Sequence, residues 1–257
     1  PDKEGRLQIL GLHTRNKPLA EGIDLDKIAR ETFGFSGAHL ESLANEAAIL
    51  AMREGKEVIE QRHFEEAIEK VIMGEKLKRR PRQEELRRVA FHEAGHAVVS
   101  ELVEPGSVSS VTVASRDEAL GYIRKAAEAD QYLQTQRYLE EQIMVLLAGA
   151  MAEDTFLGGK STGAAADYEK AVDLAKLMIA TGMSPLGVVC PDSVPDQLYH
   201  ETLASIAGAQ ERAAREALLA REEALRRVVD LLLEKESVGG DELRALLQDT
   251  PGPGGEP

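Results

Sequence analysis

The stretch Phe91-His92-Glu93-Ala94-Gly95-His96-Ala97-Val98-Val99 decides how the rest of this sequence is read. It contains an H-E-x-x-H pattern, in which two histidines stand four residues apart. In an α-helix that spacing places both imidazoles on one face, where they can share a metal ion. Glu93 lies one step round the helix, near such a metal but not bound to it. There it can take a proton from a water molecule that zinc activates, so the pattern is typical of zinc-dependent hydrolysis.

The residues around the motif favour a helix from 84 to about 103. Val89, Val99 and Val103 share the face of the two histidines, which therefore interrupt an apolar stripe. Core histidines that bond to backbone carbonyls are the alternative, but two histidines one turn apart with a glutamate between them favour the metal. Gly95 inside a helix costs ~1 kcal/mol relative to alanine, which indicates that another backbone or a substrate comes close there.

A catalytic zinc normally takes three protein ligands and leaves its fourth position to water. One known arrangement would place glycine at 99 and histidine at 102, where this chain has Val99 and Leu102. The third ligand must therefore come from elsewhere. His200 and several carboxylates, Glu153 among them, are candidates.

Helix periodicity singles out Asp167 among those carboxylates. Ser161-Thr162-Gly163 predicts a capped helix start, and Asp167 then heads an apolar stripe formed by Ala171, Leu174 and Met178. A carboxylate in such a stripe is out of place unless it is paired or binds a metal. It could also merely favour the helix dipole from the first turns, so spacing alone leaves both interpretations open.

Composition limits the classes of protein to consider. The chain has 257 residues, 45 acidic against 31 basic, and a formal net charge of −14, which disfavours nucleic acid as a partner. The single cysteine, Cys190, fits a reducing compartment. Because no window approaches the roughly 20 apolar residues of a membrane span, we expect the chain as given to be soluble.

The chain is expected to be mainly α-helical and to form two parts. The first, 1–75, contains helices beginning at Asp24 and Ser36 and a third over 63–73; Leu7-Gln8-Ile9-Leu10 reads as a short strand without a partner, which would fit a piece of a larger fold. A basic linker over 76–82 follows, then a second domain over 83–248. A proline- and glycine-rich tail over 249–257 is expected to be disordered.

Within the second domain, 108–114 is the best strand candidate because it is rich in valine, serine and threonine. Helical patterns follow over about 134–156, 164–181 and 198–236, and a last short helix is capped by Asp241.

Beyond the metal motif, the sequence resembles FtsH-type ATP-dependent zinc metalloproteases, peptidase family M41. The likeness covers about residues 6–248 and rests on several motifs in the right order. Those similar to the helical lid of the family's AAA+ ATPase module are His13-Thr14-Arg15-Asn16-Lys17-Pro18-Leu19, Gly34-Phe35-Ser36-Gly37-Ala38 and Asn45-Glu46-Ala47-Ala48. Those similar to its peptidase domain are the zinc-motif helix, Ser161-Thr162-Gly163-Ala164, Gly182-Met183-Ser184 and Leu233-Glu234-Lys235-Glu236.

The resemblance implies a partial AAA+ lid followed by a mostly helical zincin-type peptidase domain with a small β element. It implies a zinc ion held by His92, His96 and Asp167, with Glu93 as the catalytic base. The full-length protein would be a hexamer that uses ATP and Mg²⁺ to deliver unfolded polypeptides. It would lie at the cytoplasmic face of the cell membrane, anchored only through N-terminal helices that are not in this sequence.

Two departures from the family pattern are expected to matter. No G-x-x-x-x-G-K-[ST] phosphate loop occurs, so no ATP-binding residue is assigned in this chain. The segment Ile123-Arg124-Lys125-Ala126-Ala127, after the matching Gly121-Tyr122, is unusually charged for an edge that pairs with an extended substrate. The alternative function is therefore a catalytically silent, hexamerising scaffold, which metal analysis with a casein digestion would distinguish from a protease.

Overall fold

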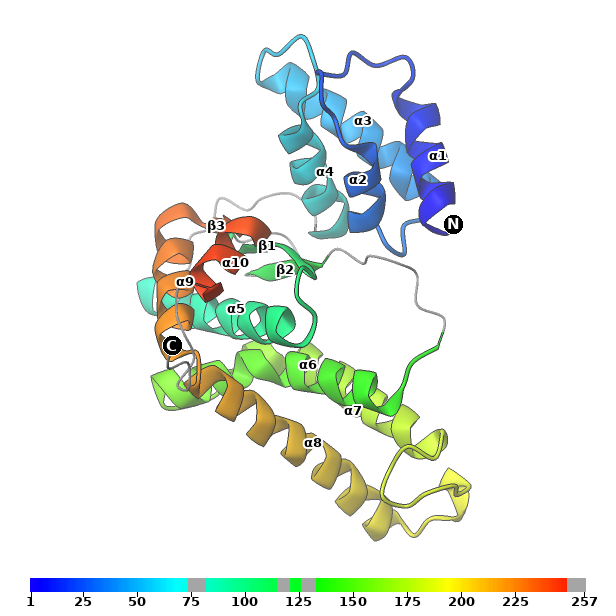
Figure 1. Cartoon of the computed structure of the whole chain (residues 1–257), viewed down its shortest axis with the longest axis vertical. Helices are drawn as coiled ribbons and strands as arrows, with labels where there is room; N and C mark the ends of the chain where they lie inside the picture. The colour runs from blue at the N-terminus through cyan, green and yellow to red at the C-terminus, as the bar shows by residue number, and fades with distance from the viewer. Residues whose placement is uncertain (74–81, 115–120, 126–132, 249–257) are drawn as a thin grey trace. The chain divides into compact units, whose positions relative to one another are not determined.

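The computed structural model describes residues 1–73, 82–114, 121–125 and 133–248 (Figure 1). It is mainly helical with a small sheet, as predicted. The described residues form two compact units: unit 1 holds 1–73, 114 and 124–125, and unit 2 holds 82–113, 121–123 and 133–248. No helix within these ranges is long and apolar enough to cross a lipid bilayer. Most of the predicted linker, 76–81, and the predicted tail lie outside the described residues.

Unit 1 is a small helical bundle, and its helix starts follow the sequence signals. Asp24 caps one helix through a 2.8 Å hydrogen bond from the Lys27 amide, and Ser36 caps the next through a 3.2 Å bond from the His39 amide, as predicted. The helices are α1 (Lys3–Thr14), α2 (Leu25–Glu31), α3 (Gly37–Arg53) and α4 (Gln61–Met73). They enclose one apolar core, in which Leu10, Ile28, Leu40, Phe64 and Ile68 are fully buried.

The predicted strand over 7–10 is wrong, because these residues lie in the middle of α1. Asp2 caps this helix by accepting a 2.8 Å hydrogen bond from the Gly5 amide. Its buried stripe is Arg6, Leu10 and Thr14, at a spacing of four residues. Two of these three buried residues are polar, so the apolar residues of this segment alone do not show the spacing of the buried stripe. Residues 7–10 are therefore not a strand that lacks sheet neighbours.

The buried Arg6 is accommodated because backbone oxygens receive its hydrogen bonds. Its Nε donates to the Ala29 carbonyl at 2.9 Å and its Nη1 to the Pro1 carbonyl at 3.1 Å. A buried guanidinium with such partners joins α1 to α2 rather than disrupting the core.

Two long helices, α5 (Gln83–Val103) and α6 (Gln136–Leu157), form the centre of unit 2 and pack against each other (Figure 1). The remaining helices are η1 (Thr162–Ala164), α7 (Ala165–Ala180), η2 (Pro191–Ser193), α8 (Asp196–Leu219), α9 (Glu222–Lys235) and α10 (Gly240–Gln248). Three strands, β1 (Val108–Thr112), β2 (Tyr122–Lys125) and β3 (Ser237–Gly239), form a sheet in the order β2-β1-β3. β1 and β3 are antiparallel, with Val111 opposite Val238.

The predicted strand over 108–114 is confirmed as β1, although it ends at Thr112. The charged segment that departs from the family pattern begins in β2, which is an edge strand of the described sheet. Its last two residues, 126 and 127, lie outside the described residues.

The single helical stretch expected over 198–236 is wrong in one respect, because it is divided at Ala220 and Arg221 into α8 and α9. No glycine or proline marks the break, so the sequence around it carries no local stop signal. Packing explains the turn instead. α9 must bury a stripe of its own in the core of unit 2, formed by Ala224, Leu225, Val228, Val229 and Leu232.

The central helix α5 is buried from Ala90 to Glu101, on all its sides rather than along one stripe. Gly95 allows α6 to approach, since a Cβ at this position would lie 2.7 Å from both the Ala148 carbonyl oxygen and the Ala152 Cβ. The expectation that another backbone comes close at Gly95 is therefore confirmed. The helix that carries the metal motif is fixed by this contact.

Replacing Gly95 by alanine tests how tight that contact is. The added methyl should destabilise unit 2 by about 1–3 kcal/mol despite alanine's higher helix propensity, because it must push α6 away. The matched control is Gly208→Ala in α8, where the nearest atom to a new Cβ would be the end of the Arg212 side chain at 3.6 Å. The control should stabilise by up to about 1 kcal/mol. Urea unfolding of both variants measures this, and equal effects would contradict the close packing.

Candidate metal centre

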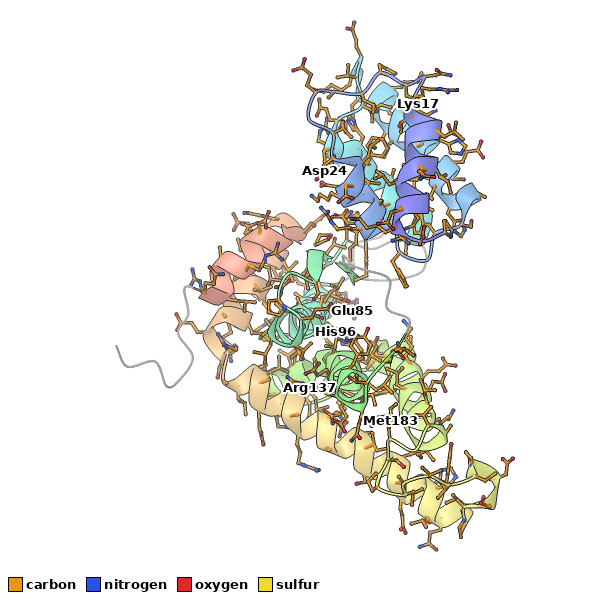
Figure 2. The ribbon with its side chains drawn as sticks, turned by 45° about the vertical axis from the view of Figure 1, so that its right-hand side comes forward. Lys17, Asp24, Glu85, His96, Arg137 and Met183 are labelled. Atoms are coloured by element: carbon orange, nitrogen blue, oxygen red, sulfur yellow. The ribbon has the colours of Figure 1, made fainter. Side chains whose placement is uncertain are left out.

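Two imidazoles of α5 lie side by side next to α6. The Nε2 atoms of His92 and His96 are 3.0 Å apart, and both residues are buried. His96 lies in the second half of α5 and Arg137 in the first turn of α6, and both are labelled in Figure 2. The four-residue spacing thus brings the two rings to one place, as the motif predicts.

The other nitrogen of each ring is held by an acceptor. His92 Nδ1 donates to Glu153 Oε1 at 2.8 Å, and His96 Nδ1 donates to the Val145 carbonyl at 2.7 Å. A neutral imidazole with its proton on Nδ1 has its lone pair on Nε2. Two such lone pairs at 3.0 Å repel each other unless a cation or a proton lies between them. Hydrogen bonding of His96 to a carbonyl and metal binding are therefore compatible, because the bond uses Nδ1 and leaves the lone pair of Nε2 available.

Asp167, from another helix, lies next to the two histidines. It is in the first turn of α7, which directly follows the short helix η1 that Ser161 caps. Its Oδ2 is 3.3 Å from the Nε2 atom of each histidine. Among the described residues, these three form the one cluster of histidine, cysteine and carboxylate side chains with metal-ligand spacing. His200 is exposed on α8 and takes no part in it.

Glu153 contacts the Nδ1 side of the His92 ring, whereas Asp167 and His96 lie on its Nε2 side. Its buried carboxylate accepts hydrogen bonds from His92 Nδ1, from Ser161 Oγ at 3.0 Å and from Arg88 Nη1 at 2.8 Å. Burial alone raises the pKa of this carboxyl, but the hydrogen bonds from its three donors outweigh it and hold the pKa below its usual value. Glu153 is therefore an ionised acceptor that orients the His92 ring.

Glu93 is buried beside the histidines. Burial raises the pKa of its carboxyl to about 6, although the two neighbouring imidazoles oppose the shift. A Cβ at position 121 would lie 2.9 Å from Glu93 Cγ, so the Gly121 backbone closes over this side chain. A carboxylate with a pKa close to neutrality suits a group that takes and returns a proton at neutral pH.

Charge dominates the site in its metal-free form. Burial lowers the pKa of His92, but hydrogen bonds to Asp167 and Glu153 outweigh it and raise the pKa to about 9. Burial likewise raises the pKa of Asp167, and the hydrogen bonds from the histidines shift it well below its usual range. The metal-free site is thus held together by a proton on His92 between two carboxylates.

Gly149 of α6 forms the floor of the site. A Cβ there would lie 2.5 Å from His96 Nε2 and 2.7 Å from His92 Nε2, which leaves no room for any larger residue. No functional role was predicted for Gly149 from its residue type. Its only signal is the run of small residues Ala148-Gly149-Ala150, which permits close approach of another element.

Two further contacts were also missed by sequence reasoning, those of Val145 and Arg88. The Val145 carbonyl is a backbone group and leaves no trace in residue type. Arg88 stands four residues before His92 and so shares its face of α5, a spacing that could have indicated its place.

Comparison with known families agrees with this geometry. The sequence model of peptidase family M41 matches residues 79–246. The chain belongs to peptidase family M41. A model of the AAA+ lid domain matches residues 22–66, within unit 1. The predicted family and its class of enzyme, the metallopeptidases, are confirmed.

Curated relatives of this M41 chain are ATP-dependent zinc metalloproteases named FtsH. The protein from Thermotoga maritima is 39% identical over 276 residues, which cover 97% of this chain and 45% of the relative. FtsH 1 from Thermomicrobium roseum is 38% identical, and the match covers 98% of this chain and 42% of the relative. FtsH 2 from a Thermoanaerobacter species is 36% identical, and the match covers 97% of this chain and 50% of the relative. The chain therefore spans about half the length of these relatives, or less.

The metal-free site should make stability depend on pH. His92 has a pKa of about 9 in the folded chain against 6.5 as its ordinary value, so protonation favours the fold. This stabilisation is complete below pH 6.5 and is lost as the pH rises through 9, on the order of 1–3 kcal/mol. Urea unfolding of the chelator-treated chain at pH 6.5 and 9 measures it. His92→Gln should flatten the dependence, and an unchanged slope in this variant would contradict the assignment.

Proposed function

We propose that this chain is a zinc endopeptidase in which His92, His96 and Asp167 hold the metal and Glu93 is the general base. One observation carries the proposal. Three ligand atoms from two helices converge with separations of 3.0, 3.3 and 3.3 Å, beside a buried glutamate whose pKa is raised. Family membership supports the same chemistry.

The donor set fits zinc. In a tetrahedral site with bonds of about 2.0–2.1 Å, neighbouring ligand atoms are about 3.3–3.4 Å apart, close to the separations found here. Two imidazoles and one carboxylate leave a fourth position open, as catalytic sites require. Glu153 and the Val145 carbonyl fix the ring orientations from behind, so little rearrangement is needed for the site to receive the ion.

The chain's own residues then divide the work of hydrolysis. A zinc ion held here would polarise a peptide carbonyl and acidify a water molecule. With zinc bound, Glu93 would accept a proton from that water and pass it to the leaving amine. The closely packed backbone at Gly149 and Gly121 confines both the imidazoles and the base, so their geometry is set before substrate arrives.

For the full-length protein we propose ATP-dependent degradation of unfolded or membrane-extracted polypeptides. The match to an AAA+ lid domain and the names of the relatives support this. In this proposal an ATPase core outside the present sequence binds ATP and Mg²⁺, the subunits form a hexamer, and N-terminal helices anchor it at the cytoplasmic face of the membrane. The residues described here contribute the lid and the peptidase site.

Glu93→Gln should keep the zinc but lower casein cleavage by at least about 100-fold, because the amide has the carboxylate's shape and cannot take a proton. Zinc content and digestion rate are measured on the same sample. The control is Glu84→Gln, an exposed position in the first turn of the same helix, which should cleave normally. Full activity in Glu93→Gln would remove Glu93 from the mechanism. An unaltered assembled chain with stoichiometric zinc and no cleavage would instead favour the silent scaffold.

Asp167→Asn should lower zinc affinity about tenfold or more, since a neutral amide is a poorer zinc ligand than a carboxylate. The measurement is zinc retained after dialysis against a mild chelator. Asp173→Asn is the matched control, because Asp173 lies on the same helix, is exposed and pairs with Lys176 in a surface salt bridge. Equal retention in both variants would mean that Asp167 is not the third ligand.

A further inference from the structure

Arg88 lies one helical turn before His92 on α5 and reaches the rear of the metal centre. A single nitrogen, Nη1, makes two hydrogen bonds: to Glu153 Oε2 at 2.8 Å and to the Gly159 carbonyl at 2.6 Å. An Nη atom carries two hydrogens, so both are used. The rest of the side chain remains about one-third exposed. The contact is therefore made by the charged end of an otherwise partly exposed residue.

The two acceptors belong to different parts of the site. Glu153 uses its other oxygen to hold His92 Nδ1 and Ser161 Oγ. Gly159 lies in the connection between α6, whose last residue is Leu157, and η1, which begins at Thr162 and leads into the helix of Asp167. Arg88 thus joins the carboxylate that orients one ligand to the segment that delivers another.

The positive charge of Arg88 compensates the buried carboxylate of Glu153. The Glu153 side chain is 1% exposed, and Arg88 is the permanently charged group among its hydrogen-bond donors. A buried carboxylate that loses its cationic partner is strongly disfavoured, so it takes up a proton or moves toward solvent. Either change would weaken or withdraw the acceptor that holds His92 Nδ1 in its orientation.

We infer that Arg88 is a positioning residue of the metal centre, which fixes Glu153 and the Gly159 connection and thereby holds His92 and Asp167 in register for the ion. The inference rests on the proposed zinc site. It assigns to Arg88 no contact with metal or substrate. Its effect should therefore appear in how tightly and in what geometry the metal is held, not only in the rate of cleavage.

The test compares zinc affinity in Arg88→Met and Arg87→Met, measured by competition with a chromogenic chelator on the whole chain. Both changes keep a long apolar stem and remove a guanidinium. Arg87 is exposed on the same helix and lies over the Phe91 ring, away from Glu153. We expect Arg88→Met to bind zinc about tenfold more weakly, in the range found for outer partners of metal ligands, and Arg87→Met to match the unaltered chain.

Substitution by lysine separates the charge from the shape of the side chain. Because one nitrogen makes both contacts, an ammonium group at that place can reproduce them, so Arg88→Lys should stay within about threefold of the unaltered affinity. Arg88→Gln, which has no charge, should resemble Arg88→Met. If Arg88→Met fails to fold by circular dichroism, the lysine and glutamine variants make the same comparison. Equal affinities in these two would overturn the inference.

The route through Glu153 is tested by combining Arg88→Met with Glu153→Gln. If Arg88 acts through that carboxylate, the double variant loses less affinity than the product of the two single losses. Fully multiplicative losses would overturn this route. The d–d absorption of bound Co²⁺ gives a second readout, and it should change in Arg88→Met because the ligand geometry changes.

Failure of the inference and failure of the proposed function are distinguishable. If the unaltered chain binds no zinc, the proposed metal site is wrong. If the unaltered chain binds one zinc and Arg88→Met binds it within twofold as tightly, the site stands and the role of Arg88 is overturned.

Discussion

The close approach of α5 and α6 at Gly95 is the constraint on which the site depends. The Ala148 carbonyl of α6 lies where a side chain at position 95 would be. Because the two helices pack this closely, they cannot move apart or slide without losing their contacts. The same approach brings Gly149 against both imidazoles and places the Val145 carbonyl and Glu153 within reach of their Nδ1 atoms. The contact of Gly95 with Ala148 thus sets the position of the two hydrogen-bond partners that α6 supplies to the imidazoles.

Electrostatics then determines what the packed site can do. Ionised groups buried together are stable only if their charges are balanced. In the metal-free chain, the two carboxylates of Asp167 and Glu153 are balanced by a proton on His92 and by the guanidinium of Arg88. A divalent cation replaces that proton and satisfies both lone pairs at once. Glu93, whose pKa moves in the opposite sense to that of Asp167, stays apart as the group able to exchange protons. The difference between the two carboxyl groups arises from their surroundings, not from their residue types.

Local patterns predicted the metal helix well and failed where tertiary packing decides. The H-E-x-x-H spacing and the caps at Asp24 and Ser36 depend on neighbours in sequence, so they could be read directly. In α1 the buried stripe contains two polar residues. Arg6 is accommodated by the distant Ala29 carbonyl of α2, and Thr14 by the Leu10 carbonyl one turn back in the same helix. The choice between Asp167 and Glu153 as third ligand was open for a related reason. Both are carboxylates on helices, and only the folded arrangement shows that one faces Nε2 and the other Nδ1.

The groups of the site come from positions far apart along the chain: 75 residues separate His92 from Asp167, and 61 separate it from Glu153, which holds the His92 ring. In an unfolded chain, closing a loop of that length carries a large entropic cost, so the three groups meet only after α5, α6 and α7 have docked. In the proposed zinc site, a bound ion would act as a reversible cross-link across most of the peptidase unit, so unfolding and metal release would become a single event. A nascent or damaged copy therefore has no assembled hydrolytic centre, which spares neighbouring proteins from cleavage by a chain that is not yet, or no longer, folded.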